Sequence, residues 1–159
     1  MPNADARDVV QQYLEAVFVR KDFEAVERLV AMEGLLKAAR GFVNAFPDVE
    51  MRTEHELAED DLVAVRVSAT GTHLGDFRGY APTGRSWQAT ASAWYRVTDG
   101  QITGAWINWD WLAIVESIGL VNWSDTSRSA GAPSGPPVPA NCVSETVEPA
   151  ASVGGRVDE

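Results

Sequence analysis

Cysteine, histidine and basic residues are all scarce in this chain of 159 residues. The one cysteine, Cys142, has no second cysteine with which to form an internal disulfide or a cysteine-based metal cluster. With His55 and His73 as the only histidines, a histidine-rich metal site is also unexpected. We therefore predict no metal and no cofactor.

Positively charged residues are fewer than negatively charged ones. The chain has 13 lysines and arginines against 23 aspartates and glutamates, for a net charge of −10. Nucleic acids and anionic membrane surfaces are recognised through cationic patches, so neither is an expected partner. The expected partner is a hydrophobic small molecule or another protein.

Long apolar runs are missing as well. No stretch approaches the roughly 20 apolar residues that a membrane-spanning helix needs. The opening sequence MPNADARDVV lacks the basic and then apolar pattern of an export signal, so we expect a cytoplasmic protein. Apolar residues nevertheless make up 45% of the chain, which is enough for one domain with a real core.

The composition changes near residue 122. Of the 38 residues in 122–159, 20 are alanine, glycine, serine or proline, and the periodic apolar pattern stops. Such a segment buries too little apolar area to offset its ordering entropy. The sequence therefore predicts a folded domain over 1–121 and a disordered tail over 122–159, which contains Cys142.

Within 1–121, helical spacing precedes strand-like alternation. A first helix follows a cap at Asn3 or Asp5, a second follows Asp22, and Gly34 is expected to interrupt the helical run that Pro47 ends. The predicted strands cover 49–57, 62–73, 86–97 and 101–110, before a short helix that ends at Gly119. Helices followed by an antiparallel meander indicate an α+β domain.

The Asp99-Gly100 pair predicts a two-residue hairpin turn, which sets a register for the last two strands. In that register Ala89, Ala91 and Ala93 lie opposite Asp110, Asn108 and Trp106. Three small side chains beside a polar pair leave room for a pocket on this face. The other face would carry Trp94, Ile107 and Trp109, an apolar surface suited to a homodimer.

Asp110 is the unusual residue of the apolar stretch GAWINWDW. Burial among aromatic side chains would raise its pKa and make it a general acid/base. The alternative is that Asp110 caps the helix that starts at Trp111 or Leu112. His73, at a strand end, either contacts a substrate at the pocket mouth or is a satisfied loop histidine. His55, on the apolar parity of its strand, either faces the pocket or is hydrogen-bonded under the helices.

Residues 46–121 resemble the SnoaL-like polyketide cyclases, a family of the nuclear-transport-factor-2-like superfamily. The matching pieces are FPD, GTHLGDFRGYAPTGR, YRVTDGQI and the pattern W…D…L…IGL, in that order. The resemblance implies a cone-shaped, curved antiparallel sheet closed by N-terminal helices around a deep hydrophobic pocket. It also implies ring closure of an aromatic polyketide by intramolecular aldol condensation without metal or cofactor. Asp110 matches the acid/base aspartate, and dimers through the sheet face are implied.

One departure from this pattern concerns a pocket wall. Members of the family usually have a strand and loop of about fifteen residues before the helix that precedes FPD, often with a histidine that faces the pocket. Here LVAMEGLLKAARG runs through without that insert, so one wall is shortened and the histidine is missing.

The leading hypothesis is a cofactor-free cyclase with Asp110 as its catalytic residue. The predicted substrate-binding residues are Asn108, Trp106, His73, Tyr95, Ala91, Ala93, His55 and Tyr13. An epoxide hydrolase or epoxide-opening cyclase in the same fold is one alternative. A non-catalytic small-ligand-binding or dimerisation domain is the other.

Overall fold

The computed structural model describes residues 5–121. The predicted tail, 122–159, and Cys142 within it lie outside the described residues. The elements are α1 (Ala6–Leu14), the π-helix η1 (Glu15–Arg20), α2 (Phe23–Leu29), α3 (Glu33–Ala45), β1 (Glu50–Glu59), β2 (Leu62–Thr72), β3 (Ser86–Thr98), β4 (Gln101–Trp109) and α4 (Trp111–Ser117).

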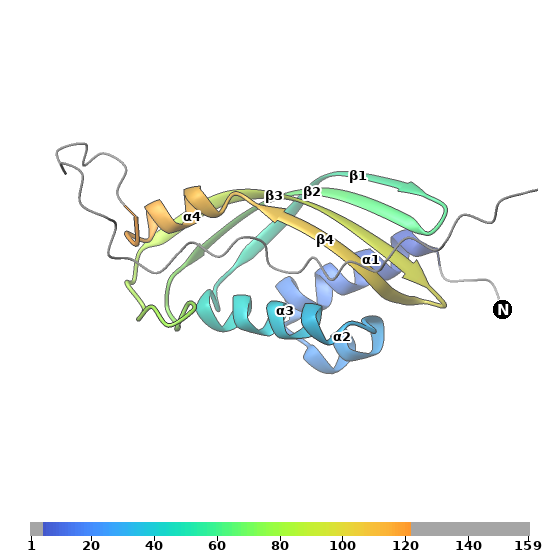
Figure 1. Cartoon of the computed structure of the whole chain (residues 1–159), viewed down its shortest axis with the longest axis horizontal. Coiled ribbons are helices and arrows are strands. Elements are labelled where there is room, and N and C mark those ends of the chain that lie inside the picture. Colours follow the sequence, from blue (N-terminus) through green and yellow to red (C-terminus); the bar gives the residue numbers. More distant parts are fainter. Residues whose placement is uncertain (1–4, 122–159) are drawn as a thin grey trace, which may run out of the picture.

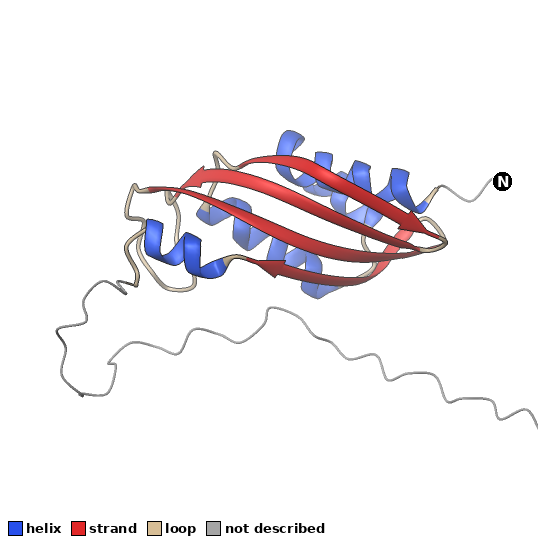
Figure 2. Cartoon of the chain, turned by 90° about the horizontal axis from the view of Figure 1, so that it is seen from above, coloured by secondary structure: helices blue, strands red, loops and turns tan. Residues whose placement is uncertain are grey.

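The four strands form one antiparallel sheet in the order β1-β2-β3-β4 (Figure 1). The sheet is curved, and α1, α2 and α3 lie on its concave side while the opposite face has no helix over it (Figures 1 and 2). The predicted α+β class, with N-terminal helices packed on a curved sheet, is confirmed. No helix among residues 5–121 is long and apolar enough to cross a membrane.

The first two helices begin where the sequence predicts. The Asp5 carboxylate accepts a hydrogen bond from the backbone N–H of Arg7, and Asp22 accepts one from Ala25 at 3.0 Å. The predicted break at Gly34 is wrong, because Gly34 lies inside α3. The chain breaks earlier because Val30 forms a parallel bridge with Ile102, which ties this segment to the edge of β4.

Strand β1 contains a bulge that moves half of its side chains to the other face. Thr53 pairs with Val67 but His55 pairs with Arg66, so Glu54 is the extra residue. His55 is therefore exposed on the outer face, and the prediction that it faces the pocket or the helices is wrong. Leu57 follows it outward and is 74% exposed.

A second bulge changes the predicted register of the last hairpin. Asp99 and Gly100 have φ values of 51° and 76°, as a two-residue turn with two left-handed positions requires. The predicted pair Val97–Ile102 forms, but Arg96 then pairs with Gly104, which leaves Thr103 as an extra residue in β4.

The shift of one residue exchanges the two faces of β4. Ala93 lies opposite Ile107, and Ala91 lies opposite Trp109, so these apolar side chains face inward. Trp106 and Asn108 face outward and are exposed. The predicted grouping of Asp110, Asn108 and Trp106 with the three alanines is therefore wrong. The outer face predicted from Trp94, Ile107 and Trp109 is wrong as well, except for Trp94.

Candidate functional site

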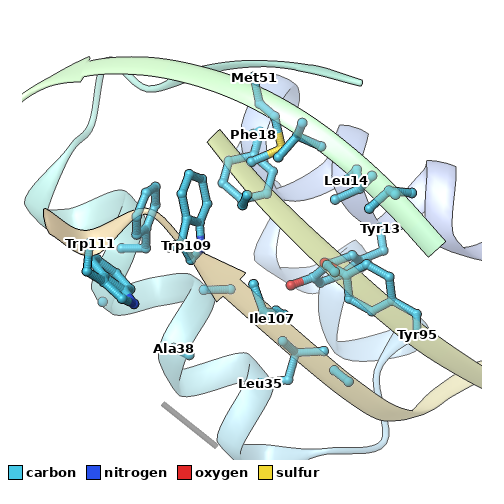
Figure 3. A pocket seen from close by; sticks show the side chains of 18 of the residues that line it. Tyr13, Leu14, Phe18, Leu35, Ala38, Met51, Tyr95, Ile107, Trp109 and Trp111 are labelled. Carbon is cyan, nitrogen blue, oxygen red and sulfur yellow. The ribbon is translucent and has the colours of Figure 1, made fainter. Parts of the chain in front are cut away.

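A cavity of about 470 Å³ lies between the helices and the concave face of the sheet (Figure 3). Its walls come from α1, η1, α3, all four strands, the first residue of α4 and the loop that joins β2 to β3. A largely apolar cavity of this size with a few polar groups is typical of a small-molecule site.

The floor of the cavity is made of small side chains. Ala91 and Ala93 of β3 are buried and line it, and Ala105 lies beside them on β4. Alanines on the inner face of a curved sheet leave the space that larger residues would fill. Of the predicted row Ala89, Ala91 and Ala93, Ala91 and Ala93 line the cavity, whereas Ala105 comes from the face of β4 that was predicted to point away from it.

Aromatic rings form one end of the cavity. Phe42 of α3 stacks on Trp109 with ring centroids 4.8 Å apart, and Phe77 stacks on Trp111 at 5.7 Å. The two tryptophans adjoin each other at 6.2 Å. Such flat apolar walls favour contact with a planar ring system.

Tyr13 and Tyr95 form the other end of the cavity (Figure 3). Both are buried, and their rings meet edge to face with centroids 5.6 Å apart. Burial raises the pKa of both phenols well above the ordinary value of tyrosine, and for Tyr13 the neighbouring Tyr95 adds to the effect. Both hydroxyls therefore stay protonated at neutral pH and can donate a hydrogen bond to a ligand oxygen.

The polar groups at the mouth come from the loop between β2 and β3. Its backbone is held against the end of α3, because Leu74 and Gly75 both donate to the carbonyl of Ala45, at 3.1 and 3.0 Å. The carboxylate of Asp76 accepts from the N–H of Gly79 at 3.0 Å. Among the described lining residues, Asp76 supplies the only carboxylate.

Arg78 lies beside Asp76 in the same loop and also lines the cavity. Its guanidinium lies over the ring of Trp111, 5.7 Å from the centroid, which places a positive charge next to the aromatic end. Within residues 5–121, no group of three His, Cys, Asp or Glu side chains is arranged to hold a metal ion.

His73 lies behind this loop and does not line the cavity. It is fully buried, and its Nδ1 accepts a hydrogen bond from the N–H of Thr83 at 3.2 Å. Its ring adjoins Phe46 and Phe77, with centroids 5.9 and 6.2 Å away. Of the two alternatives, the structure supports a histidine that holds the loop together rather than one at the pocket mouth.

Asp110 lies outside the cavity. Its side chain is exposed, and its Oδ1 accepts a hydrogen bond from the N–H of Ala113 at 3.0 Å, so Asp110 is the N-cap of α4. The prediction of a buried carboxylate beside Trp106 is wrong, because the bulge at Thr103 turns Trp109 inward and Trp106 outward. The alternative, a helix cap, agrees with the geometry.

The structure therefore brings together four of the predicted site residues: Tyr13, Tyr95, Ala91 and Ala93. Asp110, Asn108, Trp106, His55 and His73 are not part of the lining. The residues that the sequence analysis missed are Asp76 in the loop and the aromatic set Phe42, Phe77, Trp109 and Trp111. The helical spacing of Phe42 behind Leu35 and Ala39 could have pointed to one of them.

Comparison with known proteins identifies the family of this site. The model of the SnoaL-like polyketide cyclases matches residues 2–118. The chain belongs to this family. Residues 30–32 join α2 to α3, with Val30 bridged to Ile102. This SnoaL-like chain has no match among functionally curated proteins.

Solved structures share the fold of this SnoaL-like chain. IdmH of Streptomyces antibioticus, described as a candidate polyketide cyclase, is 27% identical, with a TM-score of 0.63 over 73% of this chain and 99% of that chain. AclR of Streptomyces galilaeus, described as a candidate hydroxylase, is 22% identical, with a TM-score of 0.65 over 73% and 82% of the two chains. A candidate SnoaL-like cyclase of Jannaschia sp. CCS1 is 18% identical, with a TM-score of 0.67 over 77% and 97%.

Proposed function

We propose that this protein is a cofactor-free cyclase that closes a ring in a polyketide-type natural product inside the 470 Å³ cavity. The observation that carries the proposal is the distribution of polar groups in an otherwise apolar space. Two protonated phenols occupy one end, and a carboxylate and a guanidinium occupy the mouth. Family membership and the similarity to IdmH, a candidate polyketide cyclase, support the same activity.

In the proposed aldol reaction, Asp76 removes a proton from a carbon that lies between two carbonyl groups of the substrate. The resulting enolate attacks a ketone carbon of the same molecule and forms the new carbon–carbon bond. The alkoxide that results takes the proton back from Asp76, so the protein ends in its starting state. No oxidant or reductant is consumed.

Tyr13 and Tyr95 lie at the end of the cavity away from the loop that carries Asp76, so they would bind and orient an oxygen at the far end of the substrate. Their hydroxyls point into the cavity, and burial keeps them protonated (Figure 3). Arg78, in the same loop as Asp76, would stabilise the negative charge that develops on the enolate oxygen. A carboxylate can serve as the base in enolisation when a neighbouring positive charge holds the enolate oxygen. This division of roles explains how an exposed carboxylate could act as the base at the mouth of an apolar pocket.

The decisive experiment compares Asp76→Asn with Asp110→Asn, using aromatic polyketide esters that carry a ketone within reach of an activated methylene. Loss of a general base should lower the kcat of Asp76→Asn by about 10²- to 10⁴-fold. Asp110→Asn should keep near wild-type turnover, because asparagine caps a helix almost as well as aspartate.

The two variants also separate the competing assignments. If Asp110→Asn loses turnover while Asp76→Asn stays active, the assignment of Asp76 as the base is overturned. The base would then be Asp110, the aspartate that the family pattern indicates. If the wild-type protein binds such esters but turns none of them over, and both variants bind them with the wild-type affinity, the non-catalytic alternative is favoured.

We also propose that two copies pair through the outer face of the sheet. Trp94 and Trp106 are cross-strand partners there and are 48% and 42% exposed. Two large neighbouring apolar side chains on a face without helices suit a self-complementary contact across a two-fold axis. Trp94 keeps the place it had in the predicted interface, and Trp106 takes the place of Ile107 and Trp109.

Sedimentation should show a dimer for the wild type at micromolar concentration and a monomer for Trp94→Glu and Trp106→Glu. Val19→Glu is the matched control, because Val19 is 68% exposed and belongs to η1 on the helix side. A monomeric wild type would refute this assembly, and so would tryptophan variants that remain dimeric.

A further inference from the structure

A second, smaller pocket of about 180 Å³, open at the surface, adjoins the candidate active site. It lies between the α1–η1 segment and strand β1, and we call it the side chamber. Leu14, Phe18 and Met51 line both the side chamber and the main cavity. One layer of side chains therefore separates the two spaces.

The separating layer can rearrange. Phe18 and Met51 are only partly buried, and Figure 3 shows them next to Leu14 along one border of the main cavity. Methionine is unbranched and adapts its shape easily. Phe18 contacts Phe42 edge to face, with ring centroids 6.2 Å apart. Only one side of the Phe18 ring therefore packs against the aromatic end of the main cavity. Rotamer changes in two side chains would join the side chamber to the main cavity.

Two irregular segments lie on either side of the chamber. On the helical side, α1 continues into the π-helix η1, Glu15–Arg20, and π-helical turns recur at functional sites. The strand contributes the bulge at Glu54, next to the chamber residue Thr53. At one end the gap is closed by a polar clamp, in which Arg7 and Gln11 of α1 bind Glu56 of β1 at 3.0 and 3.1 Å.

The chemistry of the side chamber limits what it can hold. Its inner wall is the apolar layer already named, and at the rim the apolar Val19 is 68% exposed. The polar residues of the rim include the carboxylate of Glu15, which would repel an acidic group. An uncharged, flexible, apolar chain fits this combination.

We propose that the side chamber takes an unbranched alkyl substituent of the molecule held in the main cavity, and that Phe18 and Met51 admit it. The proposal rests on the proposed function for the identity of the main cavity as the substrate site. It adds that the substrate carries a saturated chain as well as rings. The space between η1 and β1 then determines which chain lengths bind best.

The test measures the affinity of the methyl, butyl and hexyl esters of 1-hydroxy-2-naphthoic acid by calorimetry. The wild type should bind more tightly as the chain grows, by up to about fourfold per methylene. Thr53→Phe, which fills the chamber, should bind the methyl ester as the wild type does and lose most of the gain for the longer esters. His55→Phe is the matched control, because it adds the same ring on the outer face of β1.

A second variant keeps the test independent of how well Thr53→Phe folds. Phe18→Ala widens the passage and should increase the preference for hexyl over methyl. An equal gain with chain length in the wild type and Thr53→Phe would overturn the proposal, as would no gain in the wild type. If affinity rises with chain length but the polyketide esters of the cyclase assay are not turned over, the side chamber is upheld and the cyclase is not. If those esters are turned over but affinity does not rise with chain length, the cyclase is upheld and the side chamber is not.

Discussion

Replacement of Ala91 by phenylalanine is expected to weaken ligand binding by at least about 100-fold, or about 2.8 kcal/mol. Ala91 is 3% exposed, lies on the floor of the cavity and pairs with Trp109 across the sheet. A phenyl ring there has room only within the cavity itself, so it would occupy the space of the ligand. Overpacking of this kind typically costs the fold about 1–3 kcal/mol.

The matched control for this change is Gln88→Phe, which adds the same ring on the exposed outer face of β3. Titration of a planar aromatic ester into both variants gives the comparison, and urea unfolding confirms that both are folded. Similar losses of affinity in the two variants would mean that β3 does not present Ala91 to the ligand.

The largest effect on stability is expected for Phe42→Ala, which should lower the free energy of unfolding by about 3–5 kcal/mol. Phe42 is 8% exposed and is the centre of the aromatic cluster. Its ring contacts those of Phe18, Phe46, Trp87, Trp109 and Trp111. Removal of the ring leaves a hole that so many neighbours, on η1, β3, β4, α4 and the end of α3, cannot all close.

Urea denaturation provides the measurement, with Phe23→Ala as the control. Phe23 is partly buried and packs under the guanidinium of Arg40, so its loss should cost less than about 1.5 kcal/mol. A loss below about 2 kcal/mol for Phe42→Ala would show that the aromatic cluster lines the cavity without supporting the fold.

The sequence was sufficient to predict the elements that depend on local signals. Asp5 and Asp22 cap their helices, and Asp99-Gly100 makes the hairpin turn. Tyr13 was placed in the site because helical spacing continues reliably along α1. Each of these predictions uses residues only a few positions apart, where backbone geometry leaves few choices.

The wrong assignments of His55 and Asp110 have one physical cause. A strand reverses its faces when one residue is inserted, and the bulges at Glu54 and Thr103 each do so. Nothing in the alternation of β1 or β4 marks these positions, so His55 and Asp110 were assigned to the wrong environment. Asp76 was missed for another reason: it lies in a loop, where no periodicity connects sequence to position.

The charged side chains of β1 decide how this protein can assemble. β1 is an outer strand of the sheet, and its exposed residues include Arg52, Glu54 and Glu59, with a bulge at Glu54. Charges and bulges on an outer strand discourage its pairing with a strand of another molecule. Growth of a continuous intermolecular sheet is therefore disfavoured at this edge, whereas the proposed contact through Trp94 and Trp106 would use the same patch on both molecules. Association by that route ends at two copies and does not lead to fibres.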